Sequence, residues 1–432
     1  LPICLAYRLF RNIGVAHLSA LFLAVLPWHI SLSRGAFETN ALTTLIPLGA
    51  ALMGSKKYYL STIIFAVTTY SYLAARIITF PIFLIFAWFF RPTLPRLAKM
   101  TAILLLIGLP GFISLLGKSN SRASDVGIIN PTGGWTEVSN LRFTARNNGL
   151  TDPISRVFYN KATYLTSLFT KNYLSYFSPQ FLFTSGAGES NYGIMSGTRL
   201  FYFFQLPLLL AFLYYLVKHP SRDKWVIFAL ALISPIPAAL AKGPGYAANR
   251  SAILLIWLTI MSALGAIYAL RFVSLRKANV IILLLVLPSF MFFVSDYLYR
   301  SPQVFGPAMN YGWKELIPRI KSLSQNFSEV RFSRSLSEPH IFLAFYDQID
   351  PVLYQKASQS WVRFEKTHKF LDQLDGYYLG KYRFGDLHIS DAVNHPVLLV
   401  GRPEDFPENY PEYFHIDYPT GKMAIKVAEK LP

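Results

Sequence analysis

The first 300 residues carry a series of long apolar runs separated by short polar gaps. A helix needs about 20 apolar residues to cross the hydrocarbon core of a bilayer, with a range of about 17–25. We therefore predict that residues 1–298 form a mainly α, polytopic bundle of about nine to ten membrane-spanning helices. After an opening apolar fragment, the candidate spans lie near residues 13–30, 37–53, 58–75, 77–90, 100–116, 198–217, 223–241, 251–270 and 278–298.

The composition supports a membrane location and argues against nucleic acid as a partner. Hydrophobic residues make up 53% of the 432 residues and charged residues only 15%, whereas soluble domains are nearer a quarter charged. The net charge of +18 would suit either nucleic acid or a membrane surface. Because most basic residues of the first 300 positions lie in the gaps between apolar runs, we expect membrane lipid and no nucleic acid as a partner.

The basic residues of the short gaps alternate between many and few along the chain. The positive-inside rule places the richer gaps in the cytoplasm. We therefore predict an integral protein of the cytoplasmic (inner) membrane, with segments 117–197 and 299–432 both extracytoplasmic. The richer gaps contain Arg8 and Arg11; Lys56 and Lys57; Arg91, Arg96 and Lys99; Lys218, Arg222 and Lys224; and Arg271, Arg276 and Lys277. The opposite gaps contain only Arg34, Arg76, Lys242 and Arg250.

The loop 117–197 contains a helical pattern in "TDPISRVFYNKATYLTSLFTKNYLSYF". Asp152 is a plausible cap and Pro153 suits the first turn. Apolar residues then recur at helical spacing, with Arg156 and other cations mostly elsewhere. This pattern predicts either a helix that lies in the membrane interface or an ordinary packed helix of an extracytoplasmic loop.

The composition changes after residue 298, where we predict a small extracytoplasmic α/β domain over residues 299–432. "WKELIPRIKSL" has the apolar spacing of an amphipathic helix. Strand-like runs follow, and "PTG" between the last two indicates a hairpin turn. The histidines are scattered, so we expect no metal site here and predict packing or recognition. The runs are "EVRFS", "HIFLAFY", "YYLGKYRF", "PVLLVG", "FHIDY" and "MAIKVAE".

The stretch "PWHISLSRGAFETN" places a cation and a carboxylate, Arg34 and Glu38, between two apolar runs. Four residues apart on one helix, they form either a structural ion pair or an anion site in which Glu38 orients Arg34. Arg76 either extends to the interface or binds the same anion. Lys242 and Arg250 lie either in a solvated loop or beside that anion. A phosphate would suit the arginines, whose planar guanidinium can hold two oxygens.

Several motifs in serial order resemble a family of bacterial membrane glycosyltransferases. These are "LPWHISLSRGAFETN", "YSYLAAR", "NKATYLTSLFTKNYLSYFSPQFLF" and "SPIPAAL" followed by Arg250. They resemble the relatives of protein O-mannosyltransferases and aminoarabinose transferases (glycosyltransferase family 39, GT-C superfamily). The resemblance implies a GT-C fold, a polyprenyl-phosphate sugar as donor, and an extracytoplasmic protein, lipid or glycan as acceptor.

The resemblance also implies roles for particular residues. Arg34 and Arg76 would meet the charge on the departing lipid phosphate, with Lys242 or Arg250 in reserve and Tyr72 lining the cavity. The acidic residues credited with catalysis in the family lie in the first outward loop, which would precede the start of this chain. Glu38 is therefore expected to support the reaction rather than act as its base, and the chain alone is expected to be inactive.

Two other functions fit the same pattern of spans. One is a transporter or flippase of lipid-linked glycans, and the other is a non-catalytic membrane scaffold whose outer domain binds partners. Transporters often contain internal repeats, which we do not find in this sequence. The sequence indicates no cofactor, although a divalent metal remains compatible with it.

Overall fold

The chain is described by a computed structural model that covers residues 2–35, 37–113, 127–129, 135–188, 197–241, 247–362 and 371–430. It is mainly helical, with a small sheet near the C-terminus. The chain divides into two compact units, Leu1–Val294 and Ser295–Pro432. This division lies close to the domain boundary expected at residue 298.

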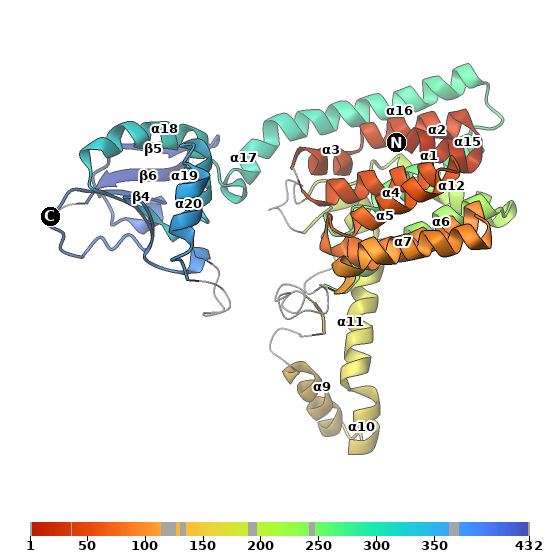
Figure 1. Cartoon of the computed structure of the whole chain (residues 1–432), viewed down its shortest axis with the longest axis horizontal. Coiled ribbons are helices and arrows are strands. Elements are labelled where there is room, and N and C mark those ends of the chain that lie inside the picture. Colours follow the sequence, from red (N-terminus) through yellow and green to blue (C-terminus); the bar gives the residue numbers. More distant parts are fainter. Residues whose placement is uncertain are drawn as a thin grey trace. The chain divides into compact units, whose positions relative to one another are not determined.

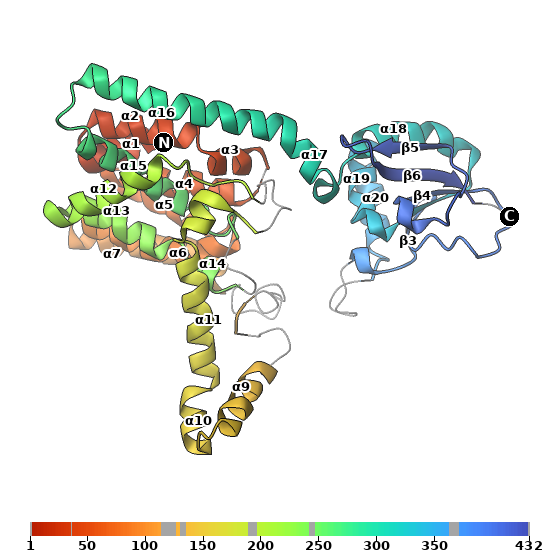
Figure 2. The ribbon, with the colours of Figure 1, turned by 180° about the vertical axis from the view of Figure 1, so that it is seen from behind.

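The first unit is built from helices that lie side by side, with the long helix α16 along one edge (Figures 1 and 2). Helix α15 is their centre: every residue from Leu254 to Ala266 is buried. A helix that is apolar all round is expected in such a position. These helices are α1 (Pro2–Phe10), α2 (Ile13–Ala24), α3 (Pro27–Arg34), α4 (Thr39–Gly54), α5 (Tyr58–Thr68), α6 (Leu73–Phe90), α7 (Leu94–Ile113), α12 (Gln205–Lys218), α13 (Arg222–Ile233), α14 (Ile236–Ala239), α15 (Leu254–Ala269) and α16 (Leu275–Ser295).

Fewer helices than predicted are long enough to cross a membrane. In the described part of the chain, three are long and apolar enough: Leu73–Phe90, Leu94–Gly111 and Leu275–Phe305. A fourth results if α2 and α3, which bend by 58° at their break, count as one span. The predicted nine to ten spans are not confirmed for the described residues, because several apolar runs form shorter helices, among them Tyr58–Thr68, Gln205–Lys218 and Leu254–Ala269.

The stretch that holds Arg34 and Glu38 is not one helix. Helix α3 ends at Arg34, and α4 begins at Thr39 after a break in which Glu38 is the N-cap residue. The expectation that these two side chains share a helix face four residues apart is therefore wrong. The two helices are joined across the break by the side-chain amide of Asn40, which donates to the carbonyl oxygen of Leu32 at 2.8 Å.

Aromatic side chains from distant segments close the core of the first unit around Trp28. Its indole lies edge-on to Phe181 and Phe201, with ring centroids 5.6 and 6.0 Å apart. The indole Nε1–H donates to the carbonyl oxygen of Ala248 at 3.2 Å. The hydroxyl of Tyr202 donates to the carbonyl oxygen of Val25 at 2.6 Å. The segment before α4, the residues around Phe181 and Phe201, and the segment before α15 are thereby fixed to one another.

The predicted loop helix is two helices, α10 (Asp152–Phe158) and α11 (Lys161–Ser175), preceded by α9 (Thr136–Asn147). Asn160 separates them, because its side chain caps α11 by accepting from the backbone N–H groups of Ala162 and Thr163 at 2.9 and 3.0 Å. In Figures 1 and 2, α11 runs across the direction of α7 and α16. Val157 of α10 is 66% exposed, so the described residues leave this apolar face uncovered, as the interfacial interpretation requires.

The second unit is a six-stranded mixed sheet in the order β2-β3-β1-β4-β6-β5. Strand β1 is parallel to β3 and β4, and the other pairs are antiparallel. Its strands are β1 (Glu329–Ser333), β2 (Tyr377–Leu379), β3 (Tyr382–Gly385), β4 (Val397–Gly401), β5 (Phe414–Asp417) and β6 (Met423–Glu429), and its α-helices are α17 (Ser301–Phe305), α18 (Trp313–Leu323), α19 (Pro339–Tyr346) and α20 (Pro351–Ser358).

Most of the predicted elements of this unit are confirmed, and one is wrong. The amphipathic helix is α18, which buries Trp313, Leu316, Ile317 and Ile320. "YYLGKYRF" forms β2 and β3 as a hairpin, and the "PTG" turn joins β5 to β6 with φ +77° at Gly421. "HIFLAFY", expected to be a strand, is helix α19, because Pro339 starts the helix in its first turn.

Short helical turns complete the described elements. They are the π-helical segments η1 (Gln180–Thr184) and η3 (Asp296–Arg300) and the 3₁₀ segments η4 (Pro307–Met309), η5 (Ser324–Asn326), η6 (Arg334–Leu336), η7 (Leu371–Gln373) and η8 (Pro403–Asp405).

Candidate functional site

A hollow of about 230 Å³ in the first unit brings together two of the predicted site residues, Tyr72 and Arg250. Tyr72 immediately precedes α6, and Arg250 lies in the turn before α15. We call this cavity the Tyr72–Arg250 hollow. Its remaining lining residues are Leu73, Ala74, Ile77, Gly127, Ile129, Pro237, Leu240 and Ala241.

Backbone contacts hold the wall of the hollow in place. Gly127 and Ala241 form an isolated antiparallel bridge, and the N–H of Ile128 donates to the carbonyl oxygen of Leu240 at 3.0 Å. The buried side chain of Asn172 on α11 donates to the carbonyl oxygen of Ala241 at 3.2 Å. Among the described residues, the walls of the hollow are mostly apolar, and the guanidinium of Arg250 lies at its border. That arrangement suits an anionic group attached to an apolar chain.

Arg76 lies one helical turn after Tyr72 on α6 and is half-buried. Its Nε is buried and has no hydrogen-bond partner among the residues that the structure describes. An unsatisfied donor on a charged group costs about 1–3 kcal/mol or more, so an anion beside it would be stabilising. A cation one helical turn from Tyr72 therefore has a donor that the described residues leave without a partner.

The remaining predicted residues are placed elsewhere or not at all. Arg34 is the last residue of α3 and Glu38 is the N-cap residue of α4, and both are exposed. Lys242 lies outside the described residues. Tyr72 and Arg250 thus meet at the hollow and Arg76 lies one turn from Tyr72, whereas Arg34 and Glu38 belong to another segment.

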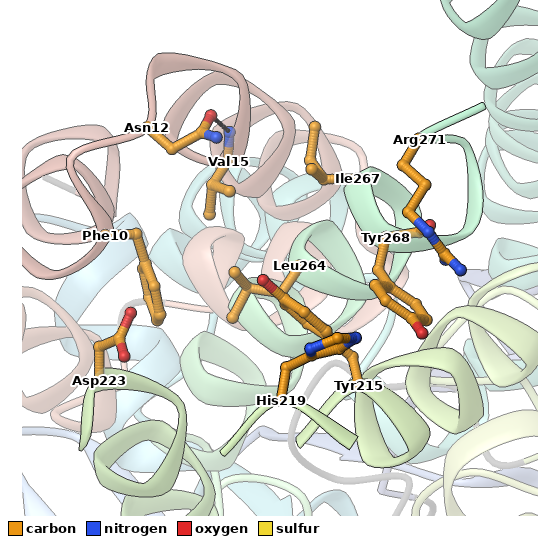
Figure 3. Close-up of a pocket in the computed structure, with 10 residues that line it drawn as sticks. All are labelled: Phe10, Asn12, Val15, Tyr215, His219, Asp223, Leu264, Ile267, Tyr268 and Arg271. Atoms are coloured by element: carbon orange, nitrogen blue, oxygen red, sulfur yellow. Dashed lines mark hydrogen bonds between the residues drawn. The ribbon is translucent and has the colours of Figure 1, made fainter. Parts of the chain in front are cut away.

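A second cavity, of about 470 Å³, lies where the gaps predicted to be cytoplasmic meet, and we call it the Asp223 pocket (Figure 3). It is formed by the α1–α2 junction, the end of α12, the start of α13 and the end of α15. Sequence reasoning missed it, because only the packing of four distant segments brings its polar groups together. It is lined by Phe10, Asn12, Val15, Tyr215, His219, Asp223, Leu264, Ile267, Tyr268 and Arg271.

A third cavity, of about 590 Å³, lies at the carboxyl ends of the parallel strands of the second unit. Ser333 ends β1, Asp386 and His388 follow β3, and Asp405 follows β4. Ligands commonly bind at this edge of parallel sheets. The same edge holds Asp375, Asp386 and His388, whose ligand atoms lie within 4.8 Å of one another and could hold a metal ion.

Asp375, Asp386 and His388 already form hydrogen bonds and ion pairs with neighbouring side chains. The ring Nε2 of His388 lies 2.7 Å from a carboxylate oxygen of Asp375, and Arg334 forms an ion pair with Asp386 at 2.7 Å. Partial burial alone would raise the pKa of Asp375, but the backbone N–H of Asp386, the ring of His388 and the charge of Arg383 hold that pKa below its ordinary value. Arginine ion pairs neutralise these carboxylates, so the group fits a structural network at least as well as a metal site.

No protein-family model matches this chain, and no curated protein matches it.

Proposed function

We propose that this chain is part of an integral-membrane glycosyltransferase of GT-C type. It moves a sugar from a polyprenyl-phosphate donor to an extracytoplasmic acceptor hydroxyl at the cytoplasmic membrane. The observation that carries the proposal is the Tyr72–Arg250 hollow, in which the guanidinium of Arg250 borders an apolar cavity. Arg76, whose buried Nε has no hydrogen-bond partner among the described residues, follows Tyr72 by one helical turn. A lipid phosphate combines the same two chemistries, an anionic head and an apolar chain.

The residues that line the hollow suggest how the donor is held. Arg250 and Arg76 donate hydrogen bonds to the phosphate oxygens, and charge-assisted bonds of this kind are about twice as strong as neutral ones. Leu73, Ile77 and Leu240 contact the first units of the prenyl chain, and Tyr72 fixes the phosphate or sugar through its hydroxyl. Arg34 and Glu38 would join only if the donor also reaches the break between α3 and α4.

The reaction is an inverting displacement at the anomeric carbon of the sugar. The acceptor hydroxyl oxygen forms a bond to this carbon while a carboxylate base takes the hydroxyl proton. The bond between the anomeric carbon and the phosphate oxygen breaks, and its electron pair stays on the phosphate. Negative charge develops on that oxygen, so pre-placed guanidinium groups lower the barrier more than they stabilise the ground state.

Binding of a short-chain polyprenyl phosphate tests the first step without requiring turnover. The Arg250→Ala and Arg76→Ala variants should each weaken binding about 10- to 150-fold, because each loses a charge-assisted bond worth about 1.5–3 kcal/mol. Arg276→Ala, an exposed arginine in a different gap, is the matched control. Equal binding of the corresponding prenol, which has no phosphate, would contradict the proposal.

The same lipid separates catalysis from transport. When the protein is supplied with the acidic first outward loop that the resemblance implies, its incubation in membranes with a radiolabelled polyprenyl-phosphate sugar should release free lipid phosphate and a labelled acceptor. Movement of the intact labelled lipid to the opposite leaflet without sugar transfer would instead indicate a flippase, and neither result together with normal folding would indicate a scaffold.

A further inference from the structure

The Asp223 pocket separates positive and negative side chains. Figure 3 shows Asp223 beside Phe10 at one end and Arg271 with Tyr268 at the other, with His219 and Tyr215 between them. These residues come from helices whose ends meet at one level of the bundle. The pocket exists without any ligand and offers hydrogen-bonding groups of both signs.

The positive end is built on two stacked tyrosines. The rings of Tyr215 and Tyr268 lie 4.4 Å apart at 21°, with the ring of His219 5.6 and 5.9 Å from them. The guanidinium of Arg271 lies 3.8 Å from the Tyr268 ring centroid, and the ammonium of Lys224 lies 3.8 Å from that of Tyr215. Aromatic faces hold these cations in place without neutralising them.

Neither cation has a carboxylate partner in the described part of the chain. Lys224 is only 5% exposed, and its contact there is the Tyr215 ring. Arg271 donates one N–H to the carbonyl oxygen of Tyr268 at 2.7 Å, which leaves other N–H groups for a ligand. Lys224 does not line the pocket, so Arg271 is the cation that a ligand would meet among the described lining residues. The remaining N–H groups of Arg271 make this end of the pocket favourable for a negatively charged group.

The opposite end favours a positive group. Asp223 has no ion-pair partner within 4.0 Å among the residues that the structure describes, even though Lys224 follows it directly in the chain. An ordinary anion would therefore be attracted by Arg271 and repelled by Asp223. A simple cation would be attracted by Asp223 and repelled by Arg271.

The pocket also has an apolar side through which a lipid chain could leave it. Ile267 lines the pocket and is 37% exposed on the surface of α15. The gaps around the pocket carry the basic residues that juxtamembrane segments use at the level of lipid headgroups. A ligand with two opposite charges and an attached apolar chain satisfies every feature of this site.

We infer that the Asp223 pocket binds the headgroup of a zwitterionic phospholipid such as phosphatidylethanolamine. The phosphate lies beside Arg271 and His219, and the ammonium lies beside Asp223. The acyl chains leave past Ile267 along α15. This lipid site is separate from the Tyr72–Arg250 hollow and does not depend on the proposed glycosyl transfer.

Native mass spectrometry of the full chain tests this site. The protein is extracted into detergent with an equimolar mixture of phosphatidylethanolamine and phosphatidylglycerol, and the retained lipids are counted. The wild type should retain phosphatidylethanolamine preferentially. Asp223→Asn should lower its retention about tenfold relative to phosphatidylglycerol, because only the ammonium contact is lost, whereas Arg271→Ala should lower the retention of both lipids.

The control is Arg276→Ala, which removes the same charge from an exposed position in the same gap and should leave retention unchanged. Glycerophosphoethanolamine, the headgroup without acyl chains, should compete only weakly, and inorganic phosphate should not compete. Thermal unfolding reports folding of each variant: phosphatidylethanolamine should raise the midpoint of the wild type but not that of Asp223→Asn. Retention without headgroup preference, or an equal effect of Arg271→Ala and Arg276→Ala, would overturn the inference.

Discussion

The buried imidazole of His340 should make the stability of the second unit depend on pH. His340 lies in α19 and is only 4% exposed. Its Nδ1 is 3.1 Å from the hydroxyl of Tyr377, and the rings of Trp361 and Phe384 lie 5.2 and 5.9 Å from its own. Burial among these aromatic rings lowers the pKa of His340 from 6.5 to about 4.

The direction of the pH dependence of stability follows from which state, folded or unfolded, takes up the proton first as the pH falls. As the pH falls, the unfolded chain protonates its histidine near pH 6.5, while the folded unit resists protonation down to about pH 4. The neutral ring's contribution is therefore complete above pH 6.5 and is lost progressively between pH 6.5 and pH 4. The loss amounts to about 2 kcal/mol between pH 7.5 and pH 5, and to about 3 kcal/mol in full.

Hydrogen exchange of the full chain measures this loss. Protection factors of the amides in β1 and β4, whose residues are almost all buried, should fall about 30-fold between pH 7.5 and pH 5. His340→Gln should remove most of this pH dependence, whatever it does to stability at pH 7.5. His395→Gln, at an exposed histidine beside Glu329, should leave the dependence intact. An unchanged pH slope in His340→Gln would refute the reasoning.

Three further predictions concern packing, capping and orientation. Gly265→Ala should destabilise the detergent-solubilised protein by about 1–3 kcal/mol in thermal unfolding, because the new methyl group would lie 1.8 Å from the backbone oxygen of Leu208; Gly14→Ala, whose nearest contact is 3.2 Å, should cost less. Asn160→Ala should cost about 1 kcal/mol and speed hydrogen exchange of Ala162 and Thr163 about fivefold, whereas Asn160→Asp keeps the accepting oxygen and should not. Reporter fusions after Lys57 and after Pro302 should lie on opposite sides of the membrane, and identical signals would contradict the predicted orientation.

Local patterns predicted the second unit well where one face of an element is buried. In α18 the apolar period of the sequence matches the buried residues. In β6 the flanking turn and the β-branched residues were sufficient signals. The run "HIFLAFY" misled because aromatic and aliphatic residues without a clear period suit both states, and Pro339, which decides for a helix, lies just before the run.

Hydropathy located the apolar segments of the first unit but not the helix ends within them. The candidate near 13–30 is interrupted at Leu26, where the chain turns into α3 with Pro27 in its first turn. The candidate near 223–241 ends as α13 at Ile233 and resumes only as the single turn α14. A sum of apolar residues is insensitive to such breaks, because each depends on one proline or on a tertiary contact.

The predicted site residues show the same limit of what the sequence can predict. Arg250 and Tyr72 meet because each lies just before the start of a helix, α15 and α6, and the predicted orientation already places both residues in outward gaps. The Asp223 pocket was not predicted, because the position of His219 beside two stacked tyrosines is a product of side-chain packing.

Because of the break between α3 and α4, no single helix fixes the positions of Arg34 and Glu38 relative to each other. On one helix their spacing would be set by its pitch. Here their spacing depends on how two separate helices, connected by the hydrogen bond between Asn40 and Leu32, lie relative to each other. A ligand that breaks the hydrogen bond between Asn40 and Leu32 would let the Glu38 carboxylate change its position relative to the Arg34 guanidinium while both helices stay intact.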